Sequence, residues 1–210
     1  MPLILAIDTT GEHGSIALMR GRELIEEVAM HAPGGFSQIL FTGLERLFAR
    51  HGIKTADVAC FAAASGPGSF TGVRVGLACV KGLAEAAGRP AVAVSNLEAL
   101  AHCGTAPLRG AVIDARRGDI YGAVYDDAGR MVSPEIVSRL DTWLATLPAG
   151  VEQFVSADPL PLPGLVPAPL SLAHIIAAIA FYRLMRGEAG DPASLDANYV
   201  RRSDAEIFVR

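Results

Sequence analysis

A glycine-rich turn between a buried strand and a helix is the feature that most constrains how this chain folds. Residues 58–64 are all apolar and predict a buried strand. The turn Ser65–Gly72 follows, and its glycines let the backbone bend tightly. An apolar helical pattern then runs to Gly88, a residue type that commonly ends helices. Strand, turn and helix in this order indicate a mixed α/β fold.

Two interpretations of this turn stay open on residue chemistry alone. Backbone N–H groups at the positive end of a helix favour an anion, which makes Gly66, Gly68 and Ser69 candidates for a phosphate site. The turn is not a Walker A loop, because no Gly-Lys-Ser/Thr follows it, and its glycines do not have the GxGxxG spacing. The alternative is a tight turn that lets the helix pack closely on its neighbours.

The helix predicted over Gly72–Ala87 is apolar around most of its circumference. Its charged residues, Arg74, Lys81 and Glu85, share one narrow stripe. A helix of this kind is buried on more than one side. One side packs on a sheet, and the other needs a neighbour, which is either a helix predicted from Ser37 or another subunit.

Apolar patterns and turn residues place the other elements of the first hundred residues. Strands are predicted over 2–7, 15–19 and 22–30 as an antiparallel meander, and over 91–94. The helix from Ser37 is predicted to use this serine as its cap, Phe36 and Phe41 as a hydrophobic staple, and Gly52 as its stop.

The second half of the chain gives weaker signals. Ser95–Glu98 has capping-box spacing for a short helix, and Ser171 is predicted to cap a last helix that ends near Arg186. Between them, prolines from 159 to 169 predict a stiff, extended surface connection. Residues 198–201 are predicted to be extended.

A weak internal repeat relates the two halves. Ala111–Asp114 resembles Leu5–Asp8, and an offset of 106 residues relates both these aspartates and the alanines at 17 and 123. We therefore predict two α/β halves, 1–104 and 105–210, with a cleft between them. The residues predicted to face this cleft are Asp8, Thr9 and Thr10 in the first half, and Asp114 and Arg116 in the second.

Composition excludes several classes of protein. The chain has 210 residues, 51% of them hydrophobic, and a net charge of −4, which excludes disorder and a global basic field for nucleic acid. No apolar run approaches the roughly 20 residues of a membrane span. Its three cysteines are widely spaced, as is typical of reduced cytoplasmic thiols. The histidines form no HxxxH or HExxH pair and no GxSxG elbow occurs, so we expect neither a transition-metal site nor a serine hydrolase.

Five segments together resemble a known family, the TsaB (YeaZ-type) proteins. The resemblance spans the whole chain and is densest over residues 1–126. It rests on these segments: Ile7–Thr10, Ser65–Leu77, Lys81–Ala84, Ile113–Arg117 and Tyr199–Arg201.

The resemblance implies a duplicated fold of the actin, sugar-kinase and Hsp70 type around a degenerate nucleotide cleft. It also implies a non-catalytic dimerisation subunit for threonylcarbamoyl transfer to the adenosine next to the anticodon in tRNA. The implied partners are a metal-dependent catalytic paralogue of the TsaD type, a TsaE-type ATPase, tRNA indirectly, and a second copy when the chain is alone. Its N-terminal helices would form the interface, through Leu40, Leu44, Gly72, Val73, Gly76, Leu77 and Val80.

The chain departs from nucleotide-hydrolysing proteins of this fold at both predicted phosphate loops. Thr10 replaces the glycine of the first loop, and Ala115–Arg117 replaces the glycine pair of the second. We therefore expect no catalytic residue, no cofactor beyond weak ATP or ADP binding inside a complex, and no metal beyond weak Mg²⁺ contacts at Asp8 and Asp114. The alternatives are an autonomous ATPase or phosphotransferase of this fold and, third, a peptidase.

Overall fold

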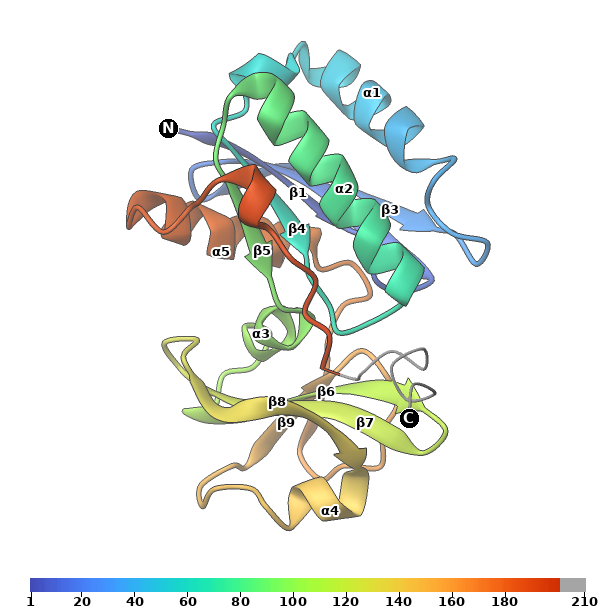
Figure 1. Ribbon diagram of the computed structural model, residues 1–210. Coiled ribbons are helices and arrows are strands. Elements are labelled where there is room, and N and C mark those ends of the chain that lie inside the picture. Colours follow the sequence, from blue (N-terminus) through green and yellow to red (C-terminus); the bar gives the residue numbers. More distant parts are fainter. Residues whose placement is uncertain (201–210) are drawn as a thin grey trace. The chain divides into compact units, whose positions relative to one another are not determined.

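A computed structural model describes residues 1–200, and its contacts divide the chain into two units. The first unit comprises Met1–Ser95 and Leu170–Ala197. The second comprises Asn96–Pro169 together with residues 198–200. The colours of Figure 1 follow the sequence, so that the blue-to-green and red parts of the first unit are seen to belong together. Each unit is described by itself below.

The first unit is built on a five-stranded sheet with the strand order β3-β2-β1-β4-β5. The first three strands form the predicted antiparallel meander, and β4 and β5 add in parallel on the other side of β1. The strand bounds are Leu3–Asp8 (β1), His13–Arg20 (β2), Glu23–His31 (β3), Cys60–Ala64 (β4) and Ala91–Val94 (β5).

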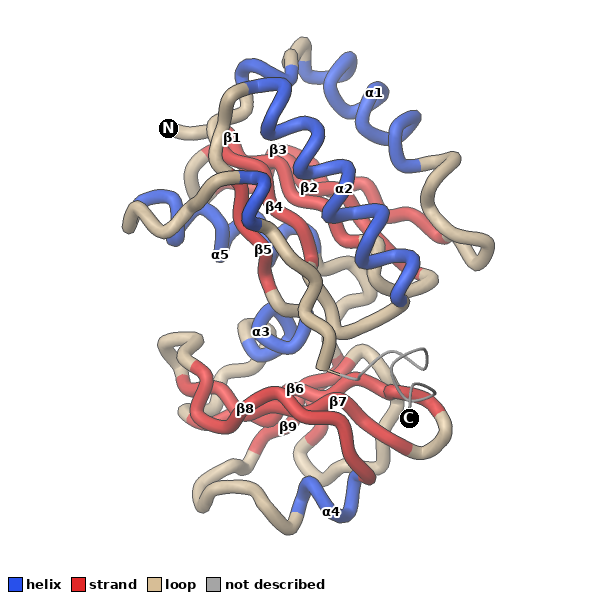
Figure 2. Tube along the Cα trace, in the orientation of Figure 1, coloured by secondary structure: helices blue, strands red, loops and turns tan. Residues whose placement is uncertain are grey.

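Helices cover both faces of this sheet (Figure 2). They are α1 (Leu40–His51), α2 (Phe70–Ala87) and α5 (Ala173–Met185), with short 3₁₀ turns at Thr55–Asp57 and Pro192–Ser194. Because successive side chains of a strand point to opposite faces, Leu3, Leu5 and Ile7 share one core with α1 and α2. The helix α5 packs on β1, β2 and β4 from the other face.

The second unit has a five-stranded sheet with the order β10-β9-β6-β7-β8. From the β8 edge, this order matches that of the first unit, with three antiparallel strands followed by two parallel ones. The predicted duplication is therefore confirmed. The bounds are Asn96–Ala101 (α3), Leu108–Arg116 (β6), Asp119–Asp126 (β7), Met131–Arg139 (β8), Leu140–Leu144 (α4), Gln153–Ser156 (β9) and Leu165–Pro167 (β10).

The strand pairing of the two sheets differs by one residue, although the spacing along the sequence is the same. Ala17 pairs with Ala6, but Ala123 pairs with Ala111, which stands one position earlier in the repeat. A bulge in β6 between Asp114 and Arg116 accompanies this shift. The spacing along the sequence therefore indicated the duplication, but it did not indicate which residues of neighbouring strands pair.

The predicted start of α1 is wrong. The helix begins at Leu40, its N-cap is Ile39, and no side chain caps it. Phe36 is buried with its ring against Gly14, whereas Phe41 is 61% exposed, so these two do not form a staple. The Phe36 carbonyl accepts hydrogen bonds from the N–H groups at 39 and 40, so a backbone turn replaces the serine cap. The predicted stop at Gly52 is confirmed by its left-handed φ of 63°.

The structure differs from the predictions at three places in the later part of the chain. Part of the proline-rich segment forms β10 at a sheet edge, where proline is tolerated. The last helix, which the sequence assigned to the second half, packs in the first unit. Residues 198–200 lie in no strand, and Arg201 lies outside the described residues.

A partly buried polar cluster fixes the start of α5 to the sheet of the first unit. The Ala173 N–H donates to Ser15 Oγ at 3.0 Å, and the His174 N–H donates to Glu27 Oε1 at 3.1 Å. Ser15 Oγ also donates to Glu27 Oε1, and His174 Nδ1 lies 2.8 Å from Glu27 Oε2. Side chains of β2 and β3 thus cap α5, which explains why the predicted Ser171 cap is not used.

Glu27 makes the stability of this anchor depend on pH. Burial by itself raises the pKa of the Glu27 carboxyl, but hydrogen bonds and charge from His174, with the Ser15 hydrogen bond, bring it below its ordinary value. A carboxyl whose pKa is lowered by folding stabilises the protein above its unfolded pKa of about 4.3, and this contribution is lost as pH falls through the folded pKa.

We predict that Glu27→Gln lowers the free energy of unfolding by about 1–3 kcal/mol at pH 7, because it weakens a charge-assisted anchor. The difference from the unsubstituted protein should shrink below pH 4. Urea unfolding at several pH values measures it, and Glu12→Gln, at an exposed position, is the control. A difference that stays constant from pH 7 to pH 3 would contradict the role of the carboxylate.

Candidate functional site

The end of β1 carries the first predicted site residues, and all of them are buried. Asp8, Thr9 and Thr10 are at most 7% exposed. Asp8 Oδ1 accepts hydrogen bonds from the Thr10 N–H at 2.9 Å and from Thr10 Oγ1 at 2.7 Å. One carboxylate oxygen of Asp8 therefore stabilises the turn that follows β1.

The glycine-rich turn is bonded directly to this strand end. The Ser69 N–H donates to the Thr10 carbonyl oxygen at 2.7 Å, and Thr9 Oγ1 donates to the Gly72 carbonyl oxygen at 2.7 Å. Ser69 caps α2, because its Oγ accepts from the Gly72 N–H. Two N–H groups of the turn that would face an anion, those of Ser69 and Gly72, are thus bonded within the chain.

The glycines of the turn permit a very close approach between α2 and β1. A Cβ at Gly68 would lie 2.5 Å from the Thr10 carbonyl oxygen, and one at Gly76 would lie 2.7 Å from Thr9 Oγ1. A Cβ at Gly72 would overlap with the Thr9 carbonyl oxygen. Gly66 is needed for a different reason, since its φ of 99° suits glycine alone. These contacts favour the close-packing interpretation of the turn.

The second predicted aspartate lies at the end of β6 in the second unit. The Asp114 N–H donates to Asp158 Oδ2 at 2.8 Å, and Asp114 Oδ1 accepts from the Arg116 N–H at 2.8 Å. The Arg116 side chain is 80% exposed and its Nη1 lies 3.8 Å from Asp114 Oδ2. Asp114 therefore orders the turn that follows it, as Asp8 does in the first unit.

The residues predicted to meet a partner lie inside the first unit. Five of them are at most 5% exposed side chains of its core, and the two glycines are buried under Thr9. The set is Leu40, Leu44, Gly72, Val73, Gly76, Leu77 and Val80. In the single chain these residues position the two helices.

The outward faces of α1 and α2 carry a different set of residues. On α2, Ala78, Gly82 and Ala86 are exposed at four-residue spacing, and a Cβ at Gly82 would meet no atom within 4 Å. On α1, Phe41 is exposed. Figure 1 shows both helices on the same side of the sheet. These exposed residues of the two helices, Phe41, Ala78, Gly82 and Ala86, are together called the outer helix surface below.

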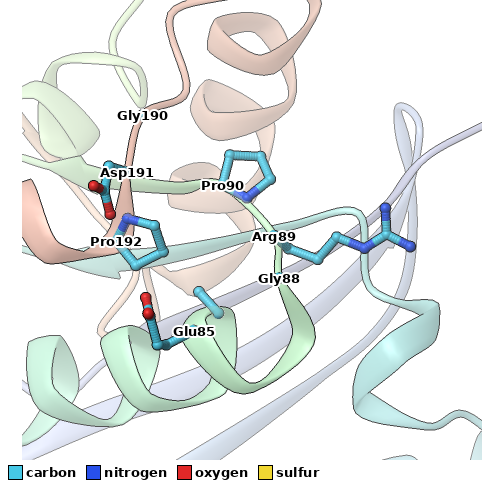
Figure 3. A pocket seen from close by; sticks show the side chains of 8 residues that line it. Glu85, Gly88, Arg89, Pro90, Gly190, Asp191 and Pro192 are labelled. Carbon is cyan, nitrogen blue, oxygen red and sulfur yellow. The ribbon is translucent and has the colours of Figure 1, made fainter.

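A hollow of about 340 Å³ lies at the C-terminal end of α2, away from the glycine-rich turn. Figure 3 shows Glu85 and Asp191 on its wall, beside Pro90 and Pro192. Asp191 is already used, because its Oδ1 accepts from the Ala193 N–H. None of the predicted site residues lines this hollow.

Other kinds of site find little support in the described residues. Over 1–200, no three His, Cys, Asp or Glu side chains gather as a metal centre requires. All three cysteines are free, and burial raises the pKa of the Cys60 thiol to about 12 and of the Cys79 and Cys103 thiols to about 11. These thiols are therefore unreactive at neutral pH. Within the same range, no helix is long and apolar enough to span a bilayer.

The shared strand order of the two units defines the class of fold. Two α/β units with the same strand order, each beginning with an antiparallel meander and ending in parallel strands, make this a duplicated fold of the actin, sugar-kinase and Hsp70 type. The family model described as TsaD, tRNA N6-adenosine threonylcarbamoyltransferase, matches residues 31–168. The crystal structure titled YeaZ from Pseudomonas aeruginosa superposes with a TM-score of 0.79 at 26% identity, over 95% of this chain and 100% of that one.

Two relatives in sequence match most of this chain. The chain is 34% identical to the tRNA threonylcarbamoyladenosine biosynthesis protein TsaB of Bacillus subtilis, over 69% of its own length and 65% of that protein's length. It is 30% identical to the uncharacterized protein Rv3421c of Mycobacterium tuberculosis, over 97% and 93% of the two lengths. The chain belongs to the TsaD family and, within it, to the TsaB (YeaZ-type) proteins.

Sequence reasoning missed the anchor of α5 and the outer helix surface. The anchor joins Ser15 and Glu27 to a helix that begins at Ala173, and no local pattern signals such a distant contact. The small residues of the outer helix surface were visible in the sequence as a four-residue series. Periodicity alone did not show which of the two glycine and alanine series faces the sheet.

Paired substitutions on α2 test this assignment. We predict that Gly72→Ala lowers the free energy of unfolding by about 1–3 kcal/mol, because its methyl group overlaps with the Thr9 carbonyl. Gly82→Ala should be neutral or stabilise by up to about 1 kcal/mol, since alanine favours a helix and the site is open. Urea unfolding measures both, and equal effects of the two substitutions would contradict the packing of α2.

Proposed function

We propose that this chain is a non-catalytic scaffold subunit in the synthesis of threonylcarbamoyladenosine in tRNA. It supports a TsaD-type catalytic paralogue that transfers the threonylcarbamoyl group to the adenosine next to the anticodon. A TsaE-type ATPase joins the assembly, which works in the cytoplasm, and the chain pairs with a second copy when the paralogue is absent. The TsaB name of the Bacillus subtilis relative and the matching family model support this proposal.

The strand-end residues argue against chemistry on this chain. A catalytic carboxylate must reach a substrate proton or a metal, yet Asp8 is 3% exposed and accepts two hydrogen bonds from Thr10. An oxyanion or phosphate site needs N–H groups aimed at the ligand, yet those of Ser69 and Gly72 are bonded within the chain. We propose that nucleotide binding at this degenerate site is weak and confined to the complex.

The outer helix surface is the observation that carries the scaffold role. Small residues at 78, 82 and 86 let the backbone of another helix approach closely, and the exposed ring of Phe41 supplies apolar area. The buried residues of α1 and α2 predicted from the sequence, such as Leu44 and Leu77, hold these helices in place from behind. We therefore propose that the association surface belongs to the same two helices and consists of their outward residues.

Gly82→Arg tests the association surface without disturbing the fold. The new side chain has open space in the single chain, so thermal unfolding should stay unchanged or improve. In the complex it would be buried without a partner, and affinity for the TsaD-type paralogue should fall at least about 100-fold. Isothermal titration calorimetry measures this, and tRNA modification in a reconstituted assay should fall in parallel.

Two controls accompany this experiment. Ala128→Arg adds the same charge at an exposed turn of the second unit and should leave affinity unchanged. Gly82→Ala adds only a methyl group and should have a small effect. Unchanged binding by a folded Gly82→Arg protein would show that the association surface lies elsewhere.

ATP hydrolysis separates the scaffold proposal from an autonomous ATPase. We predict no hydrolysis above background by the chain alone, because the turn Ser65–Gly72 is bonded to Thr9 and Thr10. The purified chain is assayed for phosphate release with Mg²⁺ and ATP, beside Asp8→Ala. Hydrolysis that needs Mg²⁺ and disappears in Asp8→Ala would instead establish an ATPase.

A further inference from the structure

The turn between β6 and β7 holds two consecutive arginines in an unfavourable backbone conformation. Arg116 and Arg117 have φ angles of 64° and 58°, and Gly118 follows with 81°. Residues with a Cβ avoid this left-handed region, and hairpin turns of this kind usually carry asparagine or glycine. The chain thus keeps arginine where smaller residues would form the turn more easily.

A third arginine joins them from the end of β8. Arg139 pairs with Asp119 across the sheet, and its Nη1 donates to the Arg117 carbonyl oxygen at 3.3 Å. A Cβ at Gly118 would overlap with the Arg139 guanidinium, which therefore lies against the backbone of the turn. Three arginines thus belong to one hairpin tip, and we call Arg116, Arg117 and Arg139 the arginine tip.

Carboxylates lie behind the arginine tip. Asp114 Oδ1 accepts from the Arg116 N–H, and Asp158 Oδ2 accepts from the Asp114 N–H. A phosphate enclosed among these backbone groups would meet carboxylates instead of N–H donors. The Arg116 side chain is 80% exposed, however, and Arg117 and Arg139 are exposed as well. This arrangement suits an extended polyanion that touches the tip from outside.

We propose that the arginine tip binds backbone phosphates of RNA. Arginine forks bond phosphate oxygens in a bidentate manner, and such contacts position a nucleic acid without reading its sequence. Because the chain has a net charge of −4, the contact acts through these few side chains and not through a general field. This inference rests on the proposed function, which brings a tRNA to the complex, and adds a direct contact to it.

The left-handed backbone of Arg116 and Arg117 allows their charges to be removed without destabilising the turn. Asparagine accepts the left-handed region, so the double substitution Arg116→Asn with Arg117→Asn removes two charges while the turn stays favourable. Its complex with the TsaD-type paralogue should have an unchanged or higher melting temperature. Its affinity for unmodified tRNA, measured by fluorescence anisotropy, should fall about tenfold or more. The dependence of log K on log salt should weaken by about 0.9 for each phosphate that the variant no longer binds.

Controls separate the arginine tip from general charge and from nucleotide binding. Arg22→Asn, in the exposed turn between β2 and β3, removes one positive charge elsewhere and should leave tRNA affinity unchanged. Arg117→Gly provides a second variant with a favourable turn. ATP is titrated into both complexes, since loss of ATP binding with unchanged tRNA binding would overturn the RNA assignment in favour of a nucleotide.

The outcomes also keep this inference apart from the proposed function. If the double variant still forms an active complex and binds tRNA with unchanged affinity and salt dependence, the arginine tip is not an RNA contact, and the scaffold role stands. If omitting the chain altogether leaves tRNA modification unchanged, the proposed function fails, whatever the arginines bind.

Discussion

The contact between α2 and the end of β1 is the constraint on which the first unit depends. Backbone and side-chain atoms of Thr9 and Thr10 lie so close to the glycine-rich turn and to α2 that side chains at 68, 72 and 76 would collide with this strand end. Two hydrogen bonds hold this contact together. Thr9 donates one to the carbonyl of Gly72, and Ser69 donates the other to the carbonyl of Thr10. The position of α2 on the sheet follows, and with it the outward direction of Ala78 and Gly82. A partner that binds this helix therefore binds a surface fixed by the strand end.

Local patterns predicted much of the fold, because they report periodicity and stop signals. The meander, the strand before the glycine-rich turn, and the glycine stops at 52 and 88 are properties of short segments. The start of α1 was wrong because a backbone turn at Phe36 replaces the cap expected of Ser37. The start of α5 was wrong for a related reason, since Ser15 and Glu27 supply its hydrogen bonds from far along the chain. Tertiary contacts of this kind leave no local pattern.

The residues of the candidate site could be predicted from the sequence, whereas their roles could be predicted only in part. The sequence singled out Asp8, Thr9 and the glycines, and the structure brings these together in the first unit. It left open whether the glycines serve an anion or close packing, because both need a small residue beside a helix N-terminus. Hydrogen bonds favour close packing, since the N–H groups of Ser69 and Gly72 already have acceptors inside the chain. Structural contacts were also needed to tell which face of α2 is buried. Gly76 and Gly82 look alike in the sequence, yet a Cβ at Gly76 would contact Thr9 and one at Gly82 would lie in open space.

The two units close the turns at their strand ends in different ways. In the first unit the freedom of the glycines is used to pack α2 against Thr9, so the turn is bonded to its own chain. In the second unit Arg116 and Arg117 occupy the turn at a conformational cost, and the carboxylates of Asp114 and Asp158 accept hydrogen bonds from the N–H groups behind them. The first unit exposes small residues on α2, and the second exposes arginine side chains. On the two proposals made above, the first unit meets a protein helix and the second a polyanion, because a close-packing helix needs small residues opposite it and phosphates pair with guanidinium groups.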